Sequence, residues 1–97
     1  MIKICKHDIQ KCIKEKCKYL YLDNCNIDGT FGEEIKDIKT LEFLDLQNNA
    51  IDWLEFEDLY LKNLKILNIS NNNIKSIPDI SELKNLVNLQ ASTNIIS

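Results

Sequence analysis

The stretch Leu41-Glu-Phe-Leu44-Asp-Leu46-Gln-Asn-Asn49-Ala-Ile51 decides the fold of this chain of 97 residues, because the same pattern occurs four times. The other copies are Cys17-Lys-Tyr-Leu20-Tyr-Leu22-Asp-Asn-Cys25-Asn-Ile27, Leu64-Lys-Ile-Leu67-Asn-Ile69-Ser-Asn-Asn72-Asn-Ile74 and Leu86-Val-Asn-Leu89-Gln-Ala91-Ser-Thr-Asn94-Ile-Ile96. Successive copies start 24, 23 and 22 residues apart. This nearly constant spacing predicts a stack of similar structural units.

Each copy predicts one short β-strand, because apolar and polar residues alternate in it. The apolar members, which should point into the core, are Leu20, Leu22, Leu44, Leu46, Leu67, Ile69, Leu89 and Ala91. Asn49, Asn72 and Asn94 share one position in the repeat, which Cys25 fills in the first copy. A buried amide there can pair with backbone groups of the neighbouring turns.

The segments between the predicted strands should supply the outer half of the core. Their apolar residues are Ile27, Phe31, Ile35 and Ile38, then Ile51, Leu54, Leu59 and Leu61, then Ile74, Ile77, Ile80 and Leu83. In the third segment the apolar residues recur every three positions and Pro78 lies among them, which predicts a 3₁₀ or irregular path. We expect a short helical turn over Glu33–Lys39. We expect Trp53, Phe56 and Tyr60 to pack on the outer, convex side; the alternative is that they form a second binding site.

Residues 1–16 break the repeat and are predicted to form an N-terminal cap. Ile2 and Ile4 alternate as in a short strand, and Asp8 can cap a helix whose apolar side is Ile9, Cys12 and Ile13. No such cap follows the fourth copy. We therefore expect weak homodimerisation through the edge formed by Leu86, Leu89, Ala91, Ile95 and Ile96, or burial of that edge in a complex.

The four copies resemble the leucine-rich repeat template L-x-x-L-x-L-x-x-N/C-x-L, in the intracellular type with repeats near 22 residues that includes regulatory subunits of protein phosphatases. The resemblance covers roughly residues 17–97. It implies a single-domain α/β solenoid over 1–97, with a cap over 1–16 and four repeats over 17–97. The parallel strands would form a concave sheet, and the concave face of such a solenoid usually binds the partner.

The four cysteines leave three interpretations open. Cys12, Cys17 and Cys25 occupy apolar or repeat positions, which favours buried thiols. The spacing of Cys5, His7, Cys12 and Cys17 lacks the close ligand pairs of a structural zinc site. Disulfides would suit an extracellular protein.

The sequence predicts a cytoplasmic protein without catalytic activity. Residues 1–18 lack the continuous apolar core of a signal peptide, and no apolar run is long enough for a transmembrane helix. His7, the single histidine, has no evident nucleophile, and the two glycines, Gly29 and Gly32, form no phosphate-binding loop. We expect neither a cofactor nor a metal.

Charge is distributed unevenly along the chain, whose net charge is −3. Residues 1–18 carry +4, whereas residues 23–58 hold eleven acidic residues against Lys36 and Lys39. This acidity argues against nucleic acid as a partner and favours a protein partner with a basic surface. We also expect no membrane partner. The alternative is a solvated face that keeps the protein soluble.

Two columns of side chains should face solvent across the concave face. The proposed partner-binding residues are Tyr19, Phe43, Ile66 and Asn88 in one column, Tyr21, Asp45, Asn68 and Gln90 in the next, and Asp23, Glu42 and Gln47 around them. The alternative is that neighbouring aromatic residues simply stabilise adjacent strands.

The leading functional hypothesis is a non-catalytic protein-binding module. A sharper version is a small intracellular inhibitor of a basic or nucleic-acid-binding enzyme, such as a phage-type antagonist of a nuclease. The first alternative is a regulatory or scaffold subunit of a cellular enzyme such as a phosphatase. The second is a metal-dependent or redox protein that uses the cysteines.

Overall fold

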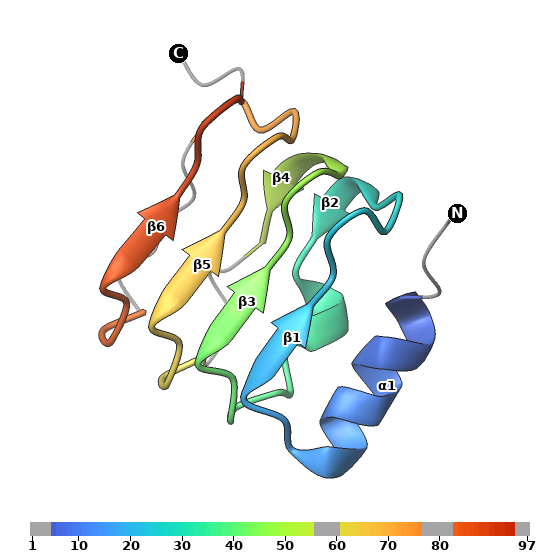
Figure 1. Cartoon of the computed structure of the whole chain (residues 1–97), viewed down its shortest axis with the longest axis vertical. Helices are drawn as coiled ribbons and strands as arrows, with labels where there is room; N and C mark the ends of the chain where they lie inside the picture. The colour runs from blue at the N-terminus through green and yellow to red at the C-terminus, as the bar shows by residue number, and fades with distance from the viewer. Residues whose placement is uncertain (1–4, 56–60, 77–82, 95–97) are drawn as a thin grey trace.

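The computed structural model describes residues 5–55, 61–76 and 83–94 of the chain. It is a small α/β solenoid in which one helix flanks a parallel sheet (Figure 1). The helix is α1 (Cys5–Glu15), and the sheet contains β1 (Tyr19–Tyr21), β3 (Phe43–Asp45), β5 (Ile66–Asn68) and β6 (Asn88–Gln90) in chain order. The predicted fold class is confirmed.

The register of this sheet follows the repeat. Tyr19 pairs with Phe43, Phe43 with Ile66 and Ile66 with Asn88, so equivalent residues of successive copies lie side by side. The core prediction is confirmed for the first three copies, whose buried strand residues are Leu20, Leu22, Leu44, Leu46, Leu67 and Ile69. In the fourth copy Leu89 and Ala91 are only partly buried against the core.

The repeated asparagine makes the predicted hydrogen bonds with the backbone. In Asn72, Oδ1 accepts from the N–H of Ile51 at 3.1 Å, and Nδ2 donates to the carbonyls of Leu46 at 2.9 Å and Ile69 at 3.0 Å. Asn49 and Asn94 make equivalent bonds to their own repeat and the preceding one. Each amide therefore joins two repeats.

The segments between the strands contain a second parallel sheet, which the sequence analysis missed. It consists of β2 (Asp28–Phe31) and β4 (Ala50–Leu54), and lies behind the larger sheet in Figure 1. A 3₁₀ turn, η1 (Glu33–Ile35), occupies part of the predicted helical turn over Glu33–Lys39. Buried residues of these segments include Phe31, Ile35, Ile38, Ile51, Leu54, Leu61, Ile74 and Leu83, as predicted.

A β-bulge determines the orientation of Trp53, which lies on a strand that the sequence did not predict. Gly29 pairs with Ile51 but Thr30 pairs with Trp53, so Asp52 is an extra residue in β4. The extra residue turns both Asp52 and Trp53 to the outside while Ile51 and Leu54 stay buried. Trp53 therefore lies on the outer side of the small sheet, where it is 41% exposed.

The N-terminal cap differs from the prediction in two respects. The structure starts α1 at Cys5, so Asp8 lies in the first helical turn rather than before the helix. Cys12 is buried and Ile9 packs partly against the core, but Ile13 is exposed. The cap contacts the first repeat through a narrower apolar face than expected.

The prediction of free, buried thiols is also wrong, because the structure pairs all four cysteines in disulfides. One joins Cys5 of α1 to Cys25, with the Cα atoms 5.8 Å apart. The other joins Cys12 to Cys17, with the Cα atoms 4.9 Å apart. Cys25 does occupy the buried repeat position, and its disulfide fastens the cap to the first repeat.

Several predictions concern residues outside the described part of the chain. They are those for Ile2, Ile4, Phe56, Leu59, Tyr60, Ile77, Pro78, Ile80, Ile95 and Ile96. Within the described residues, β6 pairs with β5 along one side only. Self-association through the β6 edge stays a prediction.

Each repeat places the residue before its Asn/Cys position in the left-handed backbone region, and the fourth residue of this series is strained. Asn24, Asn48 and Asn71 have φ of 55°, 61° and 57°, and the equivalent Thr93 has φ of 56°. Asparagine tolerates this conformation, whereas a β-branched residue does not. We expect Thr93→Asn to raise the free energy of unfolding by about 1 kcal/mol in urea denaturation.

The control for this prediction is Thr30→Asn, which makes the same change on a β-strand. Asparagine is disfavoured in strands, so this variant should be slightly less stable than the wild type. If Thr93→Asn brings no gain in stability, backbone strain at Thr93 is not significant.

Candidate functional site

An aromatic cluster lies on the solvent-facing side of the four-stranded sheet, the concave face of the sequence prediction. The ring centroid of Phe43 lies 6.3 Å from that of Tyr19 and 5.3 Å from that of Tyr21. Tyr19 is 59% exposed and Tyr21 is 50% exposed. The two tyrosines are exposed because they flank the buried Leu20 on β1, and neighbouring residues of a strand point to opposite faces of the sheet.

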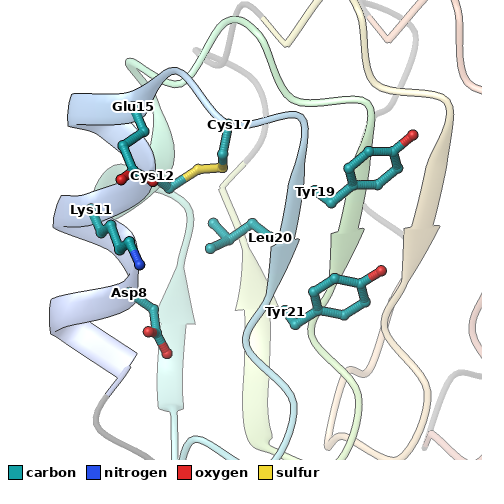
Figure 2. A pocket seen from close by; sticks show the side chains of 8 residues that line it. All are labelled: Asp8, Lys11, Cys12, Glu15, Cys17, Tyr19, Leu20 and Tyr21. Carbon is teal, nitrogen blue, oxygen red and sulfur yellow. A yellow bond between two sulfur atoms is a disulfide. The ribbon is translucent and has the colours of Figure 1, made fainter.

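A groove borders the aromatic cluster on the side of the cap. Its volume is about 290 Å³, and it is lined by Asp8, Lys11, Cys12, Glu15, Cys17 and the residues of β1. Figure 2 shows the disulfide between Cys12 and Cys17 in its wall, with the rings of Tyr19 and Tyr21 directed away from α1 and over β3. The cluster is therefore open to solvent beside the groove.

Charged residues line the edge of the concave face where the strands begin. The carboxylate of Glu42 lies 3.3 Å from Nζ of Lys65 and 3.9 Å from Nζ of Lys18. Backbone hydrogen bonds from Glu42 to Lys18 and from Lys65 to Glu42 stack these three residues on successive strands. Glu42 is thus shared by two lysines, and this edge is not acidic.

Asp45 is not the exposed polar residue that the sequence analysis expected. It is 7% exposed, and its carboxylate accepts hydrogen bonds from the backbone N–H of Gln47 at 3.0 Å and from its Nε2 at 3.1 Å. In the next repeat Oδ1 of Asn68 accepts from the N–H of Ser70 at 3.1 Å. Both side chains fix the bend after their strand.

The structure brings most of the predicted site residues onto one face. Ile66 and Asn88 continue the column that contains Phe43, while Asn68 and Gln90 continue the column that contains Tyr21. Asp23 and Gln47 follow the strands, at the opposite edge from Glu42. The surface is aromatic over β1 and β3 and mainly amide-bearing over β5 and β6, apart from the partly buried Ile66.

Residues 5–55, 61–76 and 83–94 contain no group of three or more His, Cys, Asp or Glu side chains that could hold a metal ion. The predicted lack of a metal and a cofactor stays a prediction for the whole chain. None of the helices in these ranges is long and apolar enough to cross a bilayer.

Parallel strands in chain order, one asparagine per bend and an N-terminal cap define a solenoid protein built from short repeats. A leucine-rich repeat model matches residues 16–38 and 63–89, a little over half of the chain. The chain therefore belongs to the leucine-rich repeat family. Members of this family are in general non-enzymatic modules that bind other proteins.

Several animal receptors are similar to this chain. Toll-like receptor 2 of Homo sapiens, of Macaca mulatta and of Canis lupus familiaris is in each case 40% identical over 83 residues. These residues are 86% of this chain but 10% of each receptor. The chain thus spans about a tenth of the length of the relatives it matches. The predicted subtype, that of the phosphatase regulatory subunits, stays a prediction.

Proposed function

We propose that this chain is a non-catalytic recognition module that holds a protein partner on its concave face. The observation that carries the proposal is the aromatic cluster in which the exposed rings of Tyr19 and Tyr21 lie against the partly buried Phe43. Aromatic side chains contribute most of the binding energy at many protein interfaces, because they bury a large apolar area at a small cost in side-chain entropy.

The charged side chains of the same face are held in fixed positions, which suits them to orient a bound partner. Glu42 is held by Lys18 and Lys65, and Asp45 is held by Gln47. The two lysines offset the charge of Glu42, and the carboxylate of Asp45 is mostly buried, so the two groups offer little exposed negative charge to a basic partner. An inhibitor of a basic enzyme would therefore depend on other acidic residues, such as Asp23 after β1 or those outside the concave face.

The setting that we favour is an oxidising compartment, in place of the cytoplasm expected from the sequence. Disulfides persist outside the cytosol and are rare within it. The two disulfides of this small domain support that setting, as does the similarity to receptors. A module that recognises a protein partner within a larger receptor-like protein is therefore a further candidate function, in addition to the inhibitor and the scaffold subunit.

Truncation of the aromatic cluster tests the proposal. Immobilised wild-type protein would first capture partners from an extract of its native host, and mass spectrometry would identify them. We expect Phe43→Ala and Tyr21→Ala each to weaken the purified complex by about 2 kcal/mol, roughly 30-fold in Kd, since each removes apolar contact area. Calorimetric titration measures the change.

Val87→Ala is the matched control, because Val87 is an apolar residue that is 81% exposed at the far end of the sheet. It should leave Kd within about twofold of the wild type. Unchanged affinity in both aromatic variants, with native circular dichroism spectra, would place the binding site elsewhere.

A further inference from the structure

The outer face of the small sheet differs in chemistry from the concave face. Cross-strand pairs place Thr30 beside Trp53, and the bulge adds Asp52 on the same side. Asp28 and Glu55 are exposed at the two ends of this surface. We call these five residues, Asp28, Thr30, Asp52, Trp53 and Glu55, the Trp53 face.

The acidic groups of the Trp53 face are free to interact with a partner. In the part of the chain that the structure describes, the carboxylates of Asp28, Asp52 and Glu55 take part in no hydrogen bond or ion pair. Lys75 follows the turn where the N–H of Asn73 donates to Ile51, yet it forms no ion pair there either. These three carboxylates make the described part of this surface acidic.

The backbone around these residues is held in place. The N–H of Glu55 donates to the carbonyl of Phe31 at 2.8 Å. Gly32 packs so closely that a Cβ atom there would lie 2.3 Å from the carbonyl oxygen of Glu55. The end of β4 is thus held against β2, so the Trp53 face is preformed and little conformational freedom is lost when it binds.

An exposed indole among unpaired carboxylates has the chemistry that binds a guanidinium group. Arginine stacks on the face of tryptophan through cation–π attraction and pairs with carboxylates through its planar set of donors. We propose that the Trp53 face is a second docking surface, which takes an arginine-rich segment of a protein partner. It is separate from the concave face, so the two surfaces can be tested independently.

Fluorescence gives a direct test, because Trp53 is the single tryptophan of the chain. An octa-arginine peptide should change the Trp53 emission with a saturable dependence on concentration. An octa-citrulline peptide, which has the same shape without the charge, should not. An octa-lysine peptide should bind several-fold more weakly than octa-arginine, because ammonium groups stack less well on indole.

Variants tested with a dye-labelled octa-arginine peptide separate this surface from general attraction to acidic groups. We expect Asp28→Asn/Asp52→Asn/Glu55→Gln to raise Kd at least tenfold and Trp53→Leu to raise it about fivefold. The matched control is Glu33→Gln/Asp37→Asn, which removes two carboxylates from the same acidic segment. Glu33 is already paired with Lys36 at 2.6 Å, and this contact raises the pKa of Lys36.

The control variant and Phe43→Ala should both bind the peptide as the wild type does. The proposal is overturned if the triple variant and the control lose affinity equally, or if octa-arginine leaves the emission of Trp53 unchanged at saturation. Equal binding of octa-arginine and octa-lysine, unaffected by Trp53→Leu, would also overturn it, since charge alone would then explain the attraction.

Discussion

Replacing Asn72 with alanine is expected to lower the free energy of unfolding by about 3 kcal/mol. The carbonyls that accept from Asn72 have other donors: Leu46 also accepts from Asn49, and Ile69 also accepts from Asn94. The N–H of Ile51 is different, because the amide oxygen of Asn72 is the partner that the structure gives it. The loss therefore comes mainly from one buried, unpaired donor and a small cavity.

Asn63→Ala is the control for this prediction, because it makes the same chemical change at an exposed site. The amide of Asn63 donates to the carbonyl of Lys39 at 3.1 Å, where water can replace it. Its loss should be below about 1 kcal/mol in urea denaturation. Equal losses in the two variants would mean that burial of the Asn72 amide does not determine its contribution.

Removal of the disulfide between Cys5 and Cys25 by double replacement with alanine is expected to cost about 3 kcal/mol. The two residues are 20 positions apart, so the cross-link restricts a sizeable loop in the unfolded chain. In the folded protein the same bond holds α1 against the first repeat. Thermal and urea unfolding would measure the loss.

The second disulfide provides the matched comparison, since Cys12 and Cys17 are only 5 positions apart. The Cys12→Ala/Cys17→Ala variant should lose less, about 2 kcal/mol, because the loop is shorter. Alkylation of the protein in a fresh extract of its native host, without reductant, should leave all four cysteines unmodified if it works in an oxidising compartment. Labelling of all four cysteines would instead indicate a reducing compartment such as the cytoplasm, in which the disulfides do not form and do not stabilise the protein.

The repeated sequence predicts the large sheet well because one spacing determines several features at once. Alternation selects Leu44 and Leu46 for the core, and the same alternation turns Phe43 to the concave face. The constant interval then aligns Phe43 with Tyr19 and Ile66. The position of Asn72 follows too, because a bend that recurs in every repeat needs the same hydrogen bonds each time.

The features that the sequence did not predict depend on local departures from the repeat. Trp53 lies on an unpredicted strand, β4, beside one inserted residue, Asp52, which shifts the strand pairing, and the spacing of apolar residues does not reveal that shift. The disulfides depend on how α1 lies against the first repeat, and α1 is not part of the repeating pattern. Asp45 is buried because Gln47 supplies its donors, a short-range contact that a column of exposed residues does not reveal.

The asparagine bonds give the solenoid a direction. The bend that follows β1 is completed by Asn49, the next by Asn72 and the third by Asn94, so each of the first three repeats depends on the one that follows it in the chain. A ribosome makes the chain from the N-terminus, so each bend emerges before the amide that satisfies it. Each new repeat therefore supplies the hydrogen bonds that complete the bend of the repeat before it. During synthesis, the bend of the most recently made repeat is the one that still lacks these bonds.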